Sequence, residues 1–250
     1  MRRNAWIQFR TALLVGAFLL AVAVASSAFA QDAAAPGATP EKRPAKGVFQ
    51  LVIEHPDFVT AIIAVLSIAG LTLIFQGFMK FRASVFMPEA TTEQIRQMIS
   101  ERKFKELIDF TENDPSFISR ALNPALKRAP SFSSMKEAME TSIGEQTADQ
   151  FRKIEYLNII GNLGPLLGLL GTVLGMVQAF SAMQAAGGSA NPADLAGGIS
   201  TALCHTFLGL FLAVPCLAAF GVLRTMVDRL TVRGALVAEE LLLMIKPAEA

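Results

Sequence analysis

Polar and ionisable side chains interrupt the most apolar stretches of this 250-residue chain. The last apolar stretch contains His205, with Ser200, Thr201 and Thr206 close by, and the stretch before it contains Thr172. An imidazole gains and loses a proton near neutral pH. Ionisable groups inside a membrane span are costly, and they usually face a bundle interior or water. These residues therefore indicate a polar track through a membrane along which protons could pass.

The same side chains also have structural interpretations. Thr172 can donate its hydroxyl to the carbonyl of Gly168 in its own helix, and His205 can be satisfied by a neighbouring hydroxyl. Away from their ends, the spans carry no second ionisable residue that would complete a relay, so a proton pathway needs a carboxylate from elsewhere. Ser200 and His205 lie about 140° apart around a helix, so they do not form a nucleophile–base pair and no enzyme is expected.

The composition places these residues in a membrane protein. Hydrophobic residues make up 52% of the chain and charged residues 17%, whereas soluble domains average about 25% charged. Residues 1–30 have a basic start, an apolar stretch and the small-x-small ending Ala28-Phe29-Ala30, which is typical of a signal peptide. A permanent N-terminal anchor is the alternative. Residues 31–56 are rich in Ala, Pro and Gly and predict a flexible periplasmic linker.

Three further apolar runs are long enough to cross a bilayer. They are residues 57–80, 158–183 and 197–223. Basic residues follow the first run, precede the second and follow the third, and such residues mark the cytoplasmic side. Residues 81–157 and 224–250 are therefore expected in the cytoplasm, and the mature N-terminus and the loop 184–196 in the periplasm. This predicts a multi-pass protein of the bacterial inner membrane.

The segment between the first two spans has the apolar periodicity of amphipathic helices. Thr91 or Thr92 is expected to cap one helix, and the pair Asp114-Pro115 to start another. The last helix of the segment shows no break before the second span apart from Gly144. We therefore expect an all-α membrane protein with three transmembrane helices, whose cytoplasmic helical domain continues into the second span.

Glycines recur along the second span at separations of three or four residues. They are Gly161, Gly164, Gly168, Gly171 and Gly175. This spacing places them on one face of a helix, where small residues let helix backbones approach closely. Gly198 and Gly209 share an arc of the third span with His205. The pattern predicts tight helix packing, within the chain or between copies of it.

Other functions find little support in the sequence. The formal net charge is +1, and the polar segments lack the aromatic–basic interleaving of single-strand binders, so no nucleic-acid partner is expected. Cys204 and Cys216 would lie about 18 Å apart along one helix, too far to form a disulfide. Neither a metal site nor a cofactor is predicted.

The last two spans also resemble a known family. Residues 164–180 read GPLLGLLGTVLGMVQAF and residues 198–215 read GISTALCHTFLGLFLAVP. Both resemble the MotA/TolQ/ExbB proton channel family, and its ExbB/TolQ branch most, with a channel domain at residues 120–235. The resemblance implies a homopentamer whose last two spans line a small pore, with the glycine seam at the subunit contacts. The pore would hold single spans of an ExbD/TolR-like partner, each with one aspartate.

Site residues follow from the same resemblance. Thr172 matches the family's pore threonine in LLGTV, and Thr206 matches the threonine of ALxxTxxGL in the last span. Pro165 and Pro215 match prolines near the inner ends of their helices. Many ExbB proteins carry a glutamate five residues before that last threonine, whereas Thr201 stands here and the MotA branch also lacks it. The implied proton path comprises Thr172, Thr206, Thr201 and His205.

The implied function is a stator-like subunit that converts proton motive force into mechanical work on an envelope or outer-membrane transport system. A TonB/TolA-like protein would carry the force. Two alternatives remain open at this point: a non-conducting assembly scaffold with the same fold, favoured by the missing glutamate, and a MotA-like flagellar stator.

Overall fold

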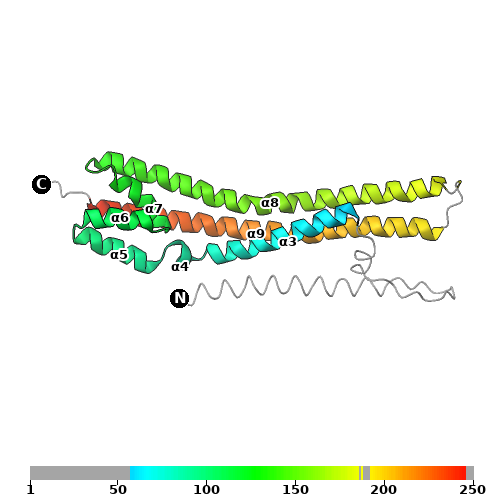
Figure 1. The fold of residues 1–250 in the computed structure, drawn as a ribbon, viewed down its shortest axis with the longest axis horizontal. Coiled ribbons are helices and arrows are strands. Elements are labelled where there is room, and N and C mark those ends of the chain that lie inside the picture. The colour runs from blue at the N-terminus through cyan, green and yellow to red at the C-terminus, as the bar shows by residue number, and fades with distance from the viewer. Residues whose placement is uncertain (1–56, 186, 188–191, 246–250) are drawn as a thin grey trace. The chain divides into compact units, whose positions relative to one another are not determined.

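The computed structural model describes residues 57–185, 187 and 192–245, and every regular element in these ranges is a helix (Figure 1). The helices are α3 (Phe58–Lys80), α4 (Ala83–Phe86), α5 (Glu89–Ser100), α6 (Phe104–Asn113), α7 (Phe117–Leu126), α8 (Phe132–Ala185) and α9 (Pro192–Ile245). The all-α prediction is thus confirmed. The predicted signal peptide and linker lie outside the described residues.

Three of these helices are long and apolar enough to cross a membrane, as predicted: α3, α8 and α9. Helices α8 and α9 contain 54 residues each, so each extends well beyond the roughly 20 residues that a bilayer requires. Pro165 lies inside α8 and Pro215 inside α9, although each removes a backbone hydrogen bond. The segment before the second span continues into it as one helix, which the sequence also predicted.

The chain divides into two compact units. Unit 1 comprises Met1–Ser67, described from residue 57 onward, together with Leu163–Pro215. Unit 2 comprises Ile68–Asn162 and Cys216–Ala250, described as far as residue 245. All the residues predicted to handle protons belong to unit 1.

Unit 2 is built on an apolar core to which α5, α6, α7, α8 and α9 all contribute. The core residues are Ile95, Ile99, Leu107, Ile118, Ala121, Leu122, Ala125, Leu126, Met135, Met139, Ala238, Leu241 and Leu242. Two ion pairs join helices around it, Arg96–Glu240 at 3.0 Å and Lys136–Glu239 at 3.8 Å. Both pairs are well exposed, and such pairs contribute about 0–1 kcal/mol, so the apolar core supplies most of the stability.

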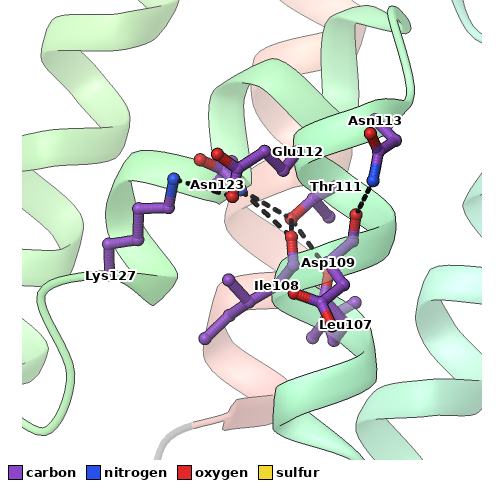
Figure 2. A network of polar contacts seen from close by, with 8 residues as sticks. All are labelled: Leu107, Ile108, Asp109, Thr111, Glu112, Asn113, Asn123 and Lys127. Atoms are coloured by element: carbon purple, nitrogen blue, oxygen red, sulfur yellow. Dashed lines mark hydrogen bonds and ion pairs between the residues drawn. The ribbon is translucent and has the colours of Figure 1, made fainter.

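A polar network joins α6 to α7 in unit 2 (Figure 2). The Asn123 amide donates to the Ile108 carbonyl at 3.3 Å and to the Thr111 hydroxyl at 3.1 Å. Thr111 is 2% exposed, and its hydroxyl donates in turn to the Leu107 carbonyl at 2.9 Å. Because every buried polar group here has a partner, the network fixes the two helices without an unsatisfied atom.

Helix α5 starts earlier than predicted. It begins at Glu89, after Pro88 in an extended conformation, so Thr91 and Thr92 lie inside the helix. The Thr92 hydroxyl donates back to the Pro88 carbonyl at 3.2 Å. The predicted threonine cap is therefore wrong, because this hydroxyl serves a carbonyl of the first turn instead of a free N–H group.

Helix α7 starts later than the pair Asp114-Pro115 suggested. Its N-cap is Ser116, whose side chain accepts from the backbone N–H of Ser119 at 3.3 Å. The Asp114 carboxylate accepts from the Ser116 N–H at 3.2 Å and from the Ser119 hydroxyl at 2.6 Å. The acidic residue thus supports the cap without forming it.

The turn between α5 and α6 contains a left-handed residue that is not glycine. Arg102 has φ 57°, its N–H donates to Ile99, and the N–H of Lys103 donates to Met98. This pairing is the Schellman motif that commonly ends helices, usually with glycine at the left-handed position. The Lys103 ammonium lies 2.7 Å from the Glu101 carboxylate. The hydrogen bond that Lys103 donates to this carboxylate lowers the pKa of Glu101.

Candidate proton-handling site

Helices α8 and α9 meet backbone to backbone in unit 1. A Cβ added at Gly209 would lie 2.3 Å from the carbonyl oxygen of Gly164, and one added at Gly164 would lie 2.6 Å from that of Gly209. Real Cβ atoms essentially never approach other atoms so closely. Only glycine therefore fits at both positions, and the backbones of the two helices are in direct contact.

Three other glycines of unit 1 continue this contact. Gly168 packs against Thr206, Gly175 against Ala202, and Gly198 against Ala179. In unit 2, a Cβ at Gly161 would lie 2.7 Å from the Leu217 side chain. The glycine seam thus packs against α9 of the same chain. Its implied role in contacts between subunits stays a prediction.

His205 lies inside the α8–α9 packing. The residue is 4% exposed, and its ring is seated against Gly171. A Cβ at Gly171 would lie 2.5 Å from both Cβ and Cγ of His205. The missing side chain at Gly171 therefore makes the room that the imidazole occupies.

A carboxylate at the start of α3 faces the same imidazole. Nε2 of His205 lies 3.6 Å from Oδ2 of Asp57, and the two side chains are 5% and 40% exposed. This separation exceeds a direct hydrogen bond, but it is within ion-pair range when the imidazole is protonated. Val59 and Ile63, 3% and 2% exposed, anchor this first part of α3 in unit 1.

The second ring nitrogen of His205 has a different environment. Nδ1 is buried and has no hydrogen-bond partner among the described residues. A buried polar atom without a partner costs about 1–3 kcal/mol. A polar group that forms a hydrogen bond with this nitrogen would therefore be stabilised there.

The predicted hydroxyls lie in three separate places in unit 1. Thr206 reaches across to α8, with its hydroxyl 3.4 Å from the Gly168 carbonyl. Thr172 donates to the Leu169 carbonyl at 2.6 Å, one residue away from the predicted acceptor, and Thr201 donates to the Gly197 carbonyl at 3.1 Å. Within the described part of unit 1, no hydrogen bond joins these hydroxyls to one another or to His205.

Thr172 borders an open, mainly apolar depression on α8. The depression is lined by Thr172, Val173, Met176, Val177, Phe180, Ser181 and Gln184. Several of the lining side chains are largely exposed, for example Val177 at 55% and Phe180 at 48%. Thr172 is thus the predicted hydroxyl that borders the open side of the α8 helix.

No group of three potential ligands among the described residues is placed to hold a metal ion.

The sequence did not indicate that Asp57 pairs with His205. It lies 148 positions earlier in the chain, at the edge of the first span, where an acidic residue is unremarkable. A helical-wheel argument compares residues within one helix, so it has no means of pairing the end of one span with the interior of another. The available signal was an unpaired intramembrane histidine, which predicts that some carboxylate lies near it.

Comparison with known proteins identifies the family. The model of the MotA/TolQ/ExbB proton channel family matches residues 92–234, more than half of the chain. The chain belongs to this family. The resemblance seen in the last two spans is therefore confirmed.

Several curated relatives share part of the sequence. The chain is 34% identical over 142 residues to biopolymer transport protein exbB1 of Vibrio cholerae, covering 53% of this chain and 60% of that protein. It is 32% identical over 83 residues to the Tol-Pal system protein TolQ of Haemophilus influenzae, covering 33% and 36%. It is 29% identical to motility protein A of Helicobacter pylori, covering 45% and 38%. The matches thus span about three fifths or less of these relatives.

A solved structure shares the fold. The chain is similar to a chain of the Campylobacter jejuni MotAB structure, with a TM-score of 0.55 and 18% identity. The similarity covers 91% of this chain and 86% of the other. At this identity the comparison supports the fold alone.

Proposed function

We propose that this chain is a stator-like subunit of a bacterial inner-membrane proton channel. With an ExbD/TolR-like single-span partner, it would convert proton motive force into mechanical work on an envelope or outer-membrane transport system. The proposal includes a homopentamer, a cytoplasmic C-terminus and a TonB/TolA-like protein that carries the force. A charge that crosses 100 mV releases about 2.3 kcal/mol, which is enough to drive conformational work over repeated cycles.

The observation that carries the proposal is the arrangement of α8 and α9 in unit 1. The glycine contacts close one face of α8 against α9, while Thr172 borders the open apolar depression on α8. An apolar surface with one hydroxyl suits a partner span that carries one aspartate. The partner's carboxylic acid would exchange its proton near Thr172 and Thr206, and the change in charge would move the partner.

A double substitution tests the hydroxyl path. Thr172→Val with Thr206→Val keeps the side-chain shape and removes both hydroxyls. Proton flux through liposomes that contain the chain and its partner should then fall at least tenfold, because positioned proton-transfer groups typically contribute about 10²–10⁴ in rate. Thr225→Val on α9 is the matched control, since its hydroxyl serves only the Gly221 carbonyl at 3.1 Å. Wild-type flux in the double variant would contradict the path.

A MotA-like motility stator is the second candidate. It is favoured by the sequence similarity to motility protein A and by Thr201 at the position where many ExbB proteins have a glutamate. The neighbouring gene product separates the two candidates, because a peptidoglycan-binding tail on the single-span partner would favour the motility stator. A non-conducting scaffold would instead assemble with the partner and give no flux in the same liposomes.

A further inference from the structure

The Asp57–His205 pair goes beyond the hydroxyl path. In the described part of unit 1, it is where two ionisable side chains of the chain meet at ion-pair distance. We propose that His205 is a proton-binding site at Nδ1 and that Asp57 is its counter-charge. This proposal rests on the proposed function as a proton channel, to which it adds a carrier supplied by the chain itself.

The two ring nitrogens have different surroundings, and this difference assigns their roles. Nε2 faces the Asp57 carboxylate at 3.6 Å, so a hydrogen on Nε2 points toward negative charge. In a neutral imidazole one nitrogen carries hydrogen and the other a lone pair. With the hydrogen on Nε2, the lone pair is on Nδ1, which is the buried nitrogen without a partner in the described residues.

The proton step is simple to balance. A proton binds the Nδ1 lone pair and forms an N–H bond, which converts the neutral ring into an imidazolium. The positive charge is then offset by the Asp57 carboxylate across the Nε2–Oδ2 contact. Release breaks the same Nδ1–H bond and returns the proton to the group that supplied it or to the next acceptor, such as the partner's aspartate.

The surroundings leave Asp57 as the principal charge that His205 meets. The α8 segment Leu163–Ala185 contains no Asp, Glu, Lys, Arg or His. On α9 the adjacent titratable side chain is Cys204, half-buried. A buried imidazolium without a counter-charge would be strongly destabilised. The carboxylate at the start of α3 is therefore what makes a charged His205 tolerable inside this packing.

Nitrogen NMR of the full chain in lipid bilayers tests the pairing without reference to flux. The chain has two histidines, so His55→Gln leaves one imidazole to observe. We expect neutral His205 to carry its hydrogen on Nε2 and to gain a second one at Nδ1 when the sample is acidified from about pH 8 to about pH 5. Asp57→Asn should mix the two tautomers, whereas Asp228→Asn should leave them unchanged. A neutral ring with hydrogen on Nδ1, or one that does not change over this range, overturns the proposal.

Flux measurements with the partner test the carrier role. His205→Gln should lower flux on the order of 100-fold and Asp57→Asn about 10-fold, with the double variant no worse than His205→Gln. Asp57→Glu should restore most of the flux, and His55→Gln alone should keep it.

Wild-type flux in both single variants, alongside lost flux in the Thr172/Thr206 double variant, overturns the carrier role and leaves the proposed function standing. If the unmodified complex gives no flux, the proposed function and the carrier role both fail, while the NMR result still reports whether the pair exists. Asp57→Asn, at a partly exposed position, keeps the test decisive if His205→Gln does not fold.

Discussion

Replacing Gly209 by alanine should separate α8 from α9. The new Cβ would lie 2.3 Å from the Gly164 carbonyl oxygen and 3.0 Å from Cα of Gly168, whereas ordinary contacts begin at 3.4 Å. The helices would therefore have to move apart by about 1 Å, because both obstacles are backbone atoms that no rotamer change can move. Overpacking of this kind costs about 1–3 kcal/mol, and alanine's better helix propensity returns at most about 1 kcal/mol.

Thermal unfolding of the purified protein in detergent measures this effect. One kcal/mol corresponds to about 2–4 °C in a chain of this size, so Gly209→Ala should lower Tm by several degrees. Gly221→Ala is the matched control on the same helix, because a Cβ there meets nothing within 4 Å. The control should keep or slightly raise Tm. If the two variants had equal Tm values, the backbone contact would not exist as described.

Two further predictions concern unit 2. Arg102→Gly should raise Tm, because a left-handed conformation costs a residue other than glycine about 1–2 kcal/mol; Arg102→Val should lower Tm, and the reverse order would contradict the Schellman turn. Asn123→Ala should destabilise the protein by about 1–3 kcal/mol, because it leaves the Thr111 hydroxyl and the Ile108 carbonyl with one partner fewer. Asn113→Ala, which removes an exposed contact within α6, should change stability by less than about 0.5 kcal/mol, and equal losses in the two variants would argue against the network.

The glycine seam shows how far the sequence could lead. Spacing of three and four residues was enough to place Gly164, Gly168, Gly171 and Gly175 on one face and to predict close packing. It could not say which helix would fill that face, because a small-residue stripe suits a helix of the same chain and one of a neighbouring copy equally well. The contacts with α9 answer this question only through their geometry.

Long-range pairing and helix ends were harder to predict. The sequence identified His205 as an ionisable residue needing a carboxylate, but the depth of Asp57 relative to His205 depends on how the spans pack. Asp114, Ser116 and Thr92 are all residue types that favour helix starts, and composition alone does not rank them. The structure uses the serine as the cap, while the Asp114 carboxylate accepts from the N–H and the hydroxyl of Ser116 and from the hydroxyl of Ser119.

The backbone contact between α8 and α9 in unit 1 also limits how these helices can move. Where two helices are separated by side chains, small rotamer changes can absorb a slide or a twist. Here peptide groups touch directly from Gly164 to Gly168, so no adjustable layer of side chains lies between the two helices there. Along this stretch the two helices should shift as a single rigid element, and a cross-link between them should leave such a motion intact.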